Sequence, residues 1–285
     1  MIEKSGAPDK INQLLSKAEA IRRSIFKIIC EGGGGHIPAS LSIVEILVAL
    51  YYECLKITPE TIGSPDRDRF ILSKGHACVS LYAVLADLGF FDKSELGRFG
   101  RRGSILGGHP DMLKIPGVEA STGALGHGLP FGAGIALAGK MDNRDYKVIV
   151  LMGDGECQEG SVWETAMFAS AHKLDNLCVI IDYNRFQAMD ALDNIIPVSP
   201  LADKWSAFGW QVKEADGHNI TELTEIFSSL PIHPLKPSLI IANTIKGKGV
   251  SFMENVPIWH YRMPNEEEMR TACEELQIEE LKKQE

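Results

Sequence analysis

Apolar runs separated by amphipathic stretches recur along this chain. The run Lys147–Met152 is apolar after its first residue, which is typical of a strand buried on both faces of a parallel sheet. A second run, Leu177–Ile181, has the same character. Three shorter strands are expected at Arg69–Leu72, Trp210–Val212 and Leu239–Asn243. The two long runs therefore predict the buried centre of a parallel sheet.

Helical patterns lie before, between and after the expected strands. Lys10–Glu31 carries apolar residues at the spacing of an amphipathic helix, whereas Phe99–Ala124 is rich in glycine and proline and is expected to be irregular. Further helices are expected from Ser40 or Ser42 to about Cys54, after His76, over Gly126–Met141, over Gln158–Lys173, near Thr221–Leu230 behind an Asn219 cap, and from Glu266. This alternation predicts an α/β fold, a doubly wound parallel sheet with helices on both faces.

The composition fits one globular domain and excludes some classes of function. The chain has 285 residues, 45% of them hydrophobic, and no internal repeat or linker, so we expect residues 1–285 to form a single domain. A net charge of −9 and a pI near 5.4 argue against a nucleic-acid or membrane-surface role. Because the N-terminus is polar and we expect no apolar run of membrane-spanning length, we expect a cytoplasmic protein.

The cysteines indicate neither a zinc site nor a disulfide framework. They are scattered without a C-x-x-C pair, and several fall in runs that are expected to be buried. The six are Cys30, Cys54, Cys78, Cys157, Cys178 and Cys273. We therefore expect reduced thiols, several of them in the core.

The most informative feature follows the two long strands. Gly153-Asp154-Gly155 comes directly after the first strand and before a helix, and Asn184 follows the second strand. In open α/β sheets, ligands bind at the carboxyl ends of the strands, so Asp154 and Asn184 are expected to emerge side by side. One carboxylate and one amide oxygen suit a hard cation that also binds phosphate oxygens, and the glycines allow backbone N–H groups to approach a diphosphate.

A simple turn is the alternative interpretation of this motif. A lone Asp-Gly most often forms a turn, and short motif matches are common. The complete pattern of strand, Gly-Asp-Gly, helix, strand and asparagine is much harder to obtain by chance. It favours a diphosphate site at the edge of the sheet.

Histidines gather in the loops. Five of the eight directly follow a glycine, namely His36, His76, His109, His127 and His218. A loop histidine usually caps a helix or binds a backbone carbonyl. Several at strand-to-helix junctions, which share one edge of the sheet, indicate more, because imidazole suits proton transfer and hydroxyl binding near neutral pH.

One block of the sequence, GDGECQEGSVWE followed by DYN, resembles the diphosphate-binding fingerprint of thiamine-diphosphate enzymes. Its residues GECQEG are similar to those of transketolases. The resemblance to transketolase covers Ala18 to about Pro264. It includes GGHIPASLS around His36, LSKGHA around His76, GGHPD around His109, STGALGHG at Ser121–Gly128 and TIKGKG at Thr244–Gly249. It implies the thiamine-diphosphate-binding fold and transfer of a two-carbon ketol unit from a ketose to an aldose.

The resemblance also implies roles for individual residues. His36, His76, His109 and His260 would bind sugar hydroxyls and assist proton transfers. His76, Gly123, Leu125, Asp154, Gly155, Glu156, Asn184, Lys246 and His260 would bind the cofactor. Asp154, Asn184 and the backbone carbonyl of Phe186 would hold Mg²⁺ or Ca²⁺, with Lys74 and Lys246 near the diphosphate.

Three positions qualify the resemblance. Glu159 matches a carboxylate that links paired active sites, but it also suits the start of a helix, where the helix dipole favours an acid. Pro38-Ala39 stands where transketolases usually have two glycines, which stiffens the loop and leaves the substrate preference open. His127 stands where a glutamine is common, so no role is assigned to it.

The chain ends about where the first domain of a transketolase ends. The charged, helix-prone tail Glu266–Glu285 carries no second α/β pattern. The resemblance therefore implies the N-terminal subunit of a split transketolase. A separate C-terminal subunit would supply the pyrimidine-binding domain and the catalytic glutamate, in an α2β2 heterotetramer that acts on sugars or sugar phosphates.

Two alternatives stay open on the sequence alone. One is the alpha subunit of a 2-oxoacid dehydrogenase decarboxylase component, which shares the Gly-Asp-Gly fingerprint but lacks this set of histidines. The other is a non-catalytic scaffold subunit, which the presence of both Asp154 and Asn184 disfavours. The sequence names neither the ketose nor the aldose.

Overall fold

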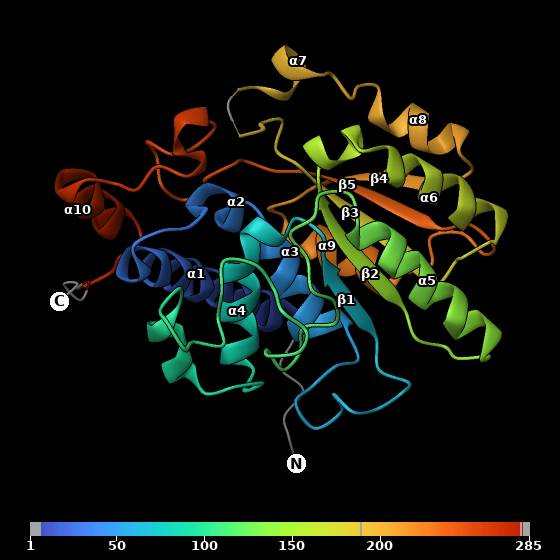
Figure 1. Cartoon of the computed structure of the whole chain (residues 1–285), viewed down its shortest axis with the longest axis horizontal. Coiled ribbons are helices and arrows are strands. Elements are labelled where there is room, and N and C mark those ends of the chain that lie inside the picture. Colours follow the sequence, from blue (N-terminus) through green and yellow to red (C-terminus); the bar gives the residue numbers. More distant parts are fainter. Residues whose placement is uncertain (1–6, 189, 280, 282–285) are drawn as a thin grey trace.

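Five parallel strands form one sheet in the order β1-β2-β3-β5-β4 (Figure 1). The computed structural model describes residues 7–188, 190–279 and 281. The strands are β1 (Arg69–Leu72), β2 (Val148–Gly153), β3 (Leu177–Tyr183), β4 (Gln211–Asp216) and β5 (Ser238–Asn243). Every strand expected from the sequence is present, and the parallel α/β architecture is confirmed.

The helices connect the strands and cover the sheet. They are α1 (Ala7–Gly32), α2 (Ile37–Leu41), α3 (Val44–Ala49), α4 (Cys78–Asp87), α5 (Gly128–Met141), α6 (Gly160–Ala171), α7 (Leu192–Ile195), α8 (Leu201–Ala207), α9 (Ile220–Ser228) and α10 (Glu266–Glu275). Asn219 caps α9 as predicted, because its side chain accepts a hydrogen bond from the Glu222 backbone N–H. The stretch 99–124 contains no regular helix or strand.

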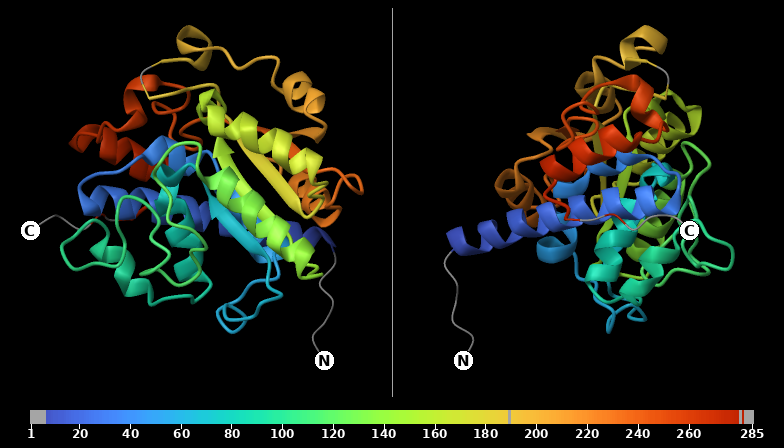
Figure 2. Two further views of the ribbon diagram at one scale, coloured as in Figure 1. Left: turned by 45° about the vertical axis from the view of Figure 1, so that its right-hand side comes forward. Right: turned by 90° about the vertical axis from the view of Figure 1, so that its left-hand side faces the viewer.

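Two hydrophobic layers flank the sheet, as a doubly wound fold requires. One face packs against α1, α3, α4 and α9, and its strand residues include Ile149, Cys178 and Ile240. The other face packs against α5 and α6 through Val150, Val179 and their neighbours. Figure 2 shows α5 and α6 lying side by side across this second face. Because the side chains of a strand alternate between faces, each central strand contributes to both layers.

The register of β2 and β3 sets the position of the ligand-binding edge. Gly153, the last residue of β2, pairs with Asp182 of β3. Asp154 and Asn184 therefore follow neighbouring strands at the same carboxyl edge of the sheet, as predicted.

The segment Ile37–Cys54 differs from the single serine-capped helix that was predicted. It forms α2, then α3, then a π-helical turn at Leu50–Cys54. Neither Ser40 nor Ser42 is the N-cap of a helix here, and Ser42 is instead the C-cap residue of α2. The Ser42 hydroxyl donates to Asp182 instead, at 2.8 Å, and His36 and Ile43 stand at the starts of α2 and α3. The Ser42 hydroxyl, which the local pattern assigned to the start of a helix, therefore bonds the buried Asp182 carboxylate instead.

The same segment corrects the expectation that no apolar run reaches membrane-spanning length. The 18-residue stretch Ile37–Cys54 is long and apolar enough by composition, but 83% of it is buried inside the protein. Its hydrophobicity is explained by packing between α1, α4 and α9. Length and composition alone do not separate such a buried segment from a membrane span.

Both ends of the chain extend past the described residues. The predicted charged helix is present as α10, which begins with a capping box between Asn265 and Glu268. The last part of the predicted tail and the polar N-terminal stretch 1–6 lie outside the described residues. Cys78, Cys157 and Cys178 are buried thiols, as expected for several of the cysteines.

Candidate functional site

A cavity of about 580 Å³ lies at the carboxyl edge of the sheet. It brings together every residue that was predicted to act in catalysis, cofactor binding or metal binding. These are His36, His76, His109, Gly123, Leu125, Asp154, Gly155, Glu156, Asn184, Phe186, Lys246 and His260. Lys74, Ala39, Gln187 and Ile195 also line it. Residues far apart in the sequence therefore form one chemical site.

The turns after β2 and β3 are joined directly through Asp154. Its carboxylate accepts the Gly155 N–H at 2.8 Å and the Arg185 N–H at 2.5 Å. Asn184 accepts the Phe186 N–H at 3.1 Å and donates to Asp182 at 2.8 Å. These bonds fix an anionic and a neutral oxygen donor at the same edge of the sheet.

The Asp154 carboxylate lacks a full counter-charge in this arrangement. Burial and the nearby Asp182 charge raise the pKa of Asp154 to about 7, although two backbone N–H groups act in the opposite direction. A positive ion at this carboxylate would favour its charged form.

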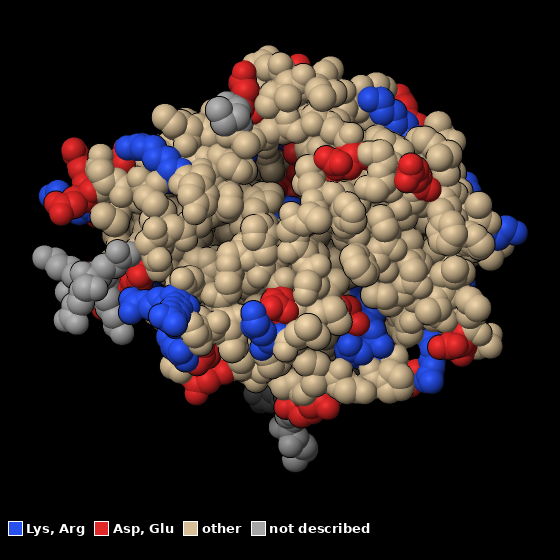
Figure 3. Space-filling model, viewed as in Figure 1, with Lys and Arg blue, Asp and Glu red and all other residues tan. Residues whose placement is uncertain are grey.

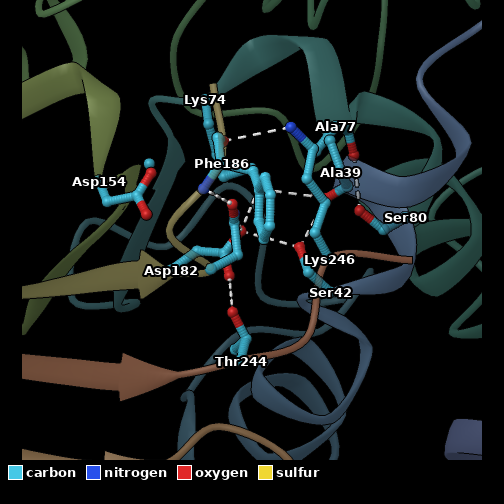
Figure 4. A network of polar contacts seen from close by, with 12 residues as sticks. Ala39, Ser42, Lys74, Ala77, Ser80, Asp154, Asp182, Phe186, Thr244 and Lys246 are labelled. Atoms are coloured by element: carbon cyan, nitrogen blue, oxygen red, sulfur yellow. Dashed lines mark hydrogen bonds and ion pairs between the residues drawn. The ribbon is translucent and has the colours of Figure 1, made fainter. Parts of the chain in front are cut away.

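Asp182 organises the bottom of the cavity, and its role was missed by the sequence prediction. This fully buried carboxylate accepts from Ser42, Asn184, Thr244 and the Lys74 ammonium (Figure 4). Burial acts to raise its pKa, but Lys74 and the other donors hold the pKa of Asp182 below its usual range. The position of Asp182 at the end of a buried strand, two residues before Asn184, was the available signal.

Two buried lysines lie at the cavity with different partners. Lys74, 2% exposed, forms an ion pair with Asp182 and donates to the Ala39 carbonyl at 3.2 Å. Lys246, 3% exposed, makes no ion pair within the described part of the chain. It donates to the carbonyls of Phe186 and Gln187 at 3.2 and 2.9 Å.

Lys246 is therefore the cation that still needs an anion. Burial and the neighbouring Lys74 charge lower the pKa of Lys246 to about 8, so it remains mostly protonated at neutral pH. A buried charge is costly unless it is compensated. An anionic ligand such as a diphosphate would supply that compensation.

Three of the predicted histidines form one cluster. The His36 ring centroid lies 5.1 Å from that of His76 and 4.9 Å from that of His260. Burial is the largest cause that lowers the pKa of all three, and the charges of Lys74 and Lys246 lower it further. The pKa values are about 4 for His36 and about 3 for His260. At neutral pH these imidazoles are uncharged, so each can both donate and accept a hydrogen bond.

His109 approaches the cavity from the irregular stretch 99–124. Its ring packs on Gly123, where an added Cβ would lie 3.0 Å from the His109 ring and φ is +139°. A larger residue at 123 would be strained and would press on the ring. The predicted cofactor-contacting glycine thus also places a predicted catalytic histidine.

Glu156 ties the loops of the site together. Its buried carboxylate accepts from the Ser73 hydroxyl, from Gly126 N–H at 3.0 Å and from Gly153 N–H at 3.3 Å. It therefore joins the turns after β1 and β2 to the loop before α5. The predicted contact of Glu156 with the cofactor stays a prediction, because its oxygens already serve the protein.

Three other residues raised by the sequence lie outside the cavity lining. His127 is the N-cap residue of α5, and its ring bonds the Leu125 carbonyl. His218 bonds Glu45 and the Ile245 N–H behind the site. Glu159 stands at the N-cap of α6 without a side-chain cap bond. Neither interpretation of Glu159 is tested by this geometry.

The oxygen donors at the cavity fit a hard divalent cation. Asp154, Asn184 and the Phe186 carbonyl supply a carboxylate, an amide and a backbone oxygen, the ligand types that Mg²⁺ and Ca²⁺ prefer. The Lys246 ammonium already contacts the Phe186 carbonyl, so this oxygen is accessible to positive charge. Among the described residues no group of three or more His, Cys, Asp and Glu side chains could hold a metal by itself. Ligand oxygens would have to complete the coordination.

The face of the molecule in Figure 3 is largely uncharged around its central hollow, and most of its Lys, Arg, Asp and Glu residues lie toward the periphery. Leu125 and Ile195, both on the cavity wall, expose 47% and 42% of their surface. These two side chains give the cavity wall an exposed apolar part.

This arrangement defines a class. The carboxyl edge of this sheet carries buried lysines, neutral histidines and an aspartate without a full counter-charge. These features are those of a binding domain for an anionic, diphosphate-containing cofactor. The family described as "Transketolase, thiamine diphosphate binding domain" matches residues 15–283. The chain belongs to the transketolase family, and this match covers its thiamine-diphosphate-binding domain.

Relatives of similar length are named as single subunits of transketolases. The chain is 41% identical over 277 residues to one of the subunits of apulose-4-phosphate transketolase from Phocaeicola vulgatus, covering 96% of this chain and 98% of that one. It is 42% identical over 266 residues to "6-deoxy-6-sulfo-D-fructose transketolase subunit SqwG" of Clostridium sp., covering 93% and 97%. These relatives do not favour the dehydrogenase or scaffold alternatives.

Solved transketolases share the fold over a part of their length. The structure from Leishmania mexicana has a TM-score of 0.86 at 27% identity, covering 93% of this chain and 41% of that chain. The structure from Campylobacter jejuni has a TM-score of 0.81 at 29% identity, covering 93% and 43%. The chain thus spans about two fifths of these longer proteins.

Proposed function

We propose that this chain is the diphosphate-binding subunit of a two-subunit transketolase that transfers a two-carbon ketol unit from a ketose to an aldose. The substrates are sugar phosphates or similarly anionic sugars, in keeping with the names of the related subunits. The enzyme is expected to work in the cytoplasm with thiamine diphosphate and a divalent cation.

One observation carries this proposal. Lys246 is a buried cation without a carboxylate partner in the described part of the chain, and Asp154 is a buried carboxylate without a full counter-charge, and both line one cavity. A diphosphate with a bound Mg²⁺ or Ca²⁺ supplies the missing charge of each sign. A plain turn at Gly-Asp-Gly would not need either group to be buried.

The residues around the cavity divide the work. Asp154, Asn184 and the Phe186 carbonyl would hold the cation, and Lys246 with the N–H groups of the Gly-Asp-Gly turn would hold the diphosphate. Lys74 keeps Asp182 charged and so keeps the bottom of the cavity rigid. Thiamine diphosphate, when bound, supplies the carbanion chemistry that cleaves and forms the bond next to the carbonyl.

The neutral histidines suit the sugar side of the reaction. His36 and His76, as neutral imidazoles, can donate to one hydroxyl and accept from another. His260 Nδ1 accepts from the Lys246 ammonium at 3.3 Å, so His260 would offer its Nε2–H to a hydroxyl. His109, whose ring packs on Gly123, would hold the donor sugar. Such groups move protons between substrate hydroxyls without bringing additional charge beside two lysines.

A partner subunit would complete the site. The relatives that are single transketolase subunits have the length of this chain, whereas the solved transketolases are more than twice as long. The apolar entrance at Leu125 and Ile195 is suited to being covered by another protein surface. We propose that a C-terminal subunit supplies the pyrimidine-binding domain and the catalytic glutamate in an α2β2 assembly.

A reconstitution assay tests this proposal. The purified chain, supplied with thiamine diphosphate and Mg²⁺, should show no ketol transfer, and adding the partner subunit should produce it. In the assembled enzyme, Asp154→Ala should abolish most cofactor binding measured by calorimetry with Mg²⁺. Full activity of the chain alone would contradict the two-subunit proposal, and unchanged cofactor affinity in Asp154→Ala would contradict the proposed metal site.

A further inference from the structure

Behind Lys246 lies a buried cluster of three side chains from three separate segments. Arg22 comes from α1, Glu45 from α3 and His218 from the turn after β4. Arg22 and Glu45 are each 8% exposed. None of the three lines the cavity described above, so the cluster serves something other than direct contact with a ligand there.

Two members of the cluster hold the backbone on either side of Lys246. The Ile245 N–H donates to His218 Nε2 at 2.8 Å. The Arg22 guanidinium donates to the Lys248 carbonyl at 2.5 Å and to the Leu41 carbonyl at 3.0 Å. The loop residues directly before and two after Lys246 are therefore fixed by side chains from distant elements.

Both anchors meet on a single carboxylate. Glu45 Oε1 accepts from Arg22, and Glu45 Oε2 lies 2.9 Å from His218 Nδ1. Because His218 Nε2 accepts from the backbone, Nδ1 must carry the proton and donate to Glu45. Glu45 thus sets the tautomer of His218 and the orientation of Arg22 at once.

The loop carries two glycines but is also held by hydrogen bonds of its own: the Lys248 N–H donates to the Ile245 carbonyl at 3.2 Å, and the Asn255 N–H donates to the Lys246 carbonyl at 2.8 Å. Gly247 and Gly249 flank Lys248 with φ of +85° and +95°, conformations that glycine adopts without strain. An added Cβ at Gly249 would lie 2.6 Å from Arg22 Cδ, so the backbone must come close for Arg22 to reach its acceptors. The contacts of Arg22 and His218, both joined to Glu45, therefore add to the bonds within the loop.

We propose that Arg22, Glu45 and His218 are positioning residues that hold the Lys246 loop for cofactor binding. The inference rests on the proposed function, since it assigns to Lys246 the cofactor diphosphate. The cluster acts through the backbone of residues 245 and 248, while the Lys246 ammonium reaches the carbonyls of Phe186 and Gln187 on the far side. Substitutions in the cluster should make the position of the Lys246 ammonium less fixed, while the ammonium itself remains present.

The test compares cofactor affinity and turnover in the enzyme assembled with its partner subunit. The Glu45→Gln side chain has nearly the same shape as glutamate. It is uncharged, and its single amide oxygen can accept from Arg22 or from His218 but no longer leaves an oxygen for each. The variant's thiamine-diphosphate dissociation constant, measured by calorimetry with Mg²⁺, should rise about tenfold, the scale seen for residues that orient ligands from behind. Turnover at saturating cofactor should stay within about twofold, because the reacting groups are untouched.

A matched control separates positioning from general stability. Glu119 forms a comparable part-buried cluster with Arg67 and Arg69, near the amino end of β1 and away from the cavity. Glu119→Gln should lower the thermal midpoint of the chain but leave the cofactor dissociation constant unchanged. Equal affinity in wild type and Glu45→Gln, or an equal rise in Glu119→Gln, would overturn the proposal.

A second variant keeps the test decisive if Glu45→Gln does not fold. His218→Ala frees the Ile245 N–H and should raise the same dissociation constant. Where both variants fold, the double variant should lose less affinity than the product of the two single losses, because the residues act as one unit. Purely multiplicative losses would contradict that unit. Failure of wild type itself to bind thiamine diphosphate would instead contradict the proposed function.

Discussion

At the scale of single residues, the two buried lysines show how burial and pairing divide a site into support and function. Lys74 neutralises Asp182, so removing it leaves a buried carboxylate without a partner. Among the described residues, Lys246 hydrogen-bonds two carbonyls and an imidazole nitrogen and forms no ion pair, although the charges of Asp154 and Asp182 act to raise its pKa. We therefore expect the first lysine to stabilise the fold and the second to bind a ligand.

This division predicts opposite outcomes for two similar substitutions. Lys74→Met should lower the free energy of unfolding by about 3 kcal/mol or more, because it strands the buried Asp182 charge. Lys246→Met should change it by about 1 kcal/mol or less, but should weaken thiamine-diphosphate binding about 30-fold in the assembled enzyme. Urea unfolding and calorimetry measure the two quantities. A Lys246→Met enzyme with wild-type affinity would contradict the role of this ammonium.

The sequence was informative where function requires particular residue types, and less so where support comes from far away. Asp154, Asn184 and the histidines His36, His76 and His109 follow glycines or strand ends, so local motifs predicted that they would gather at one edge. Glu45 and His218 are separated by 173 residues, and no local pattern connects them. Such partners become visible only when α1, α3 and the β4 turn are packed together.

At the scale of elements, α5 illustrates why a glycine-rich helix lies on this sheet. An added Cβ at Gly132 would lie 2.4 Å from Val150 Cγ2 of β2, whereas nothing lies within 4 Å of one at Gly134. The helix therefore needs a small residue on its inner face but not on its outer face. The pattern of small residues predicted close packing, and the structure shows which strand requires it.

The two glycines provide a matched pair for testing this packing. Gly132→Ala should destabilise the chain by about 1–3 kcal/mol, because the methyl group would overlap the Val150 side chain. Gly134→Ala should stabilise it by up to about 1 kcal/mol, because alanine has the higher helix propensity at an open position. Chemical unfolding of the full chain compares them. Equal effects would contradict the closeness of α5 to β2.

The strands were predicted better than the segment Ile37–Cys54. A buried parallel strand gives a short, continuous apolar run, and tertiary contacts rarely alter such a run. At the break between α2 and α3, Ser42 donates to Asp182, a contact across 140 residues. Local capping preferences therefore predicted the wrong start for this helix.

At the scale of the whole molecule, the cavity combines a polar interior with an uncharged entrance. The buried lysines and Asp154 lie inside, and the surrounding face in Figure 3 carries few charges near its centre. Shielding from water strengthens the electrostatic interactions within such a site. This arrangement suits an enzyme whose reacting groups are enclosed only after a partner subunit binds.

The most direct test of the account separates cofactor binding from sugar chemistry at His109. In the enzyme assembled with its partner subunit, His109→Ala should bind thiamine diphosphate with nearly wild-type affinity. Ketose turnover should fall about 10²-fold or more, because a group that holds the donor sugar acts mainly in the transition state. Paired assays of ketose cleavage and pyruvate decarboxylation give the answer. Full ketose activity in the variant, or wild-type decarboxylation of pyruvate without ketose turnover, would contradict a transketolase function.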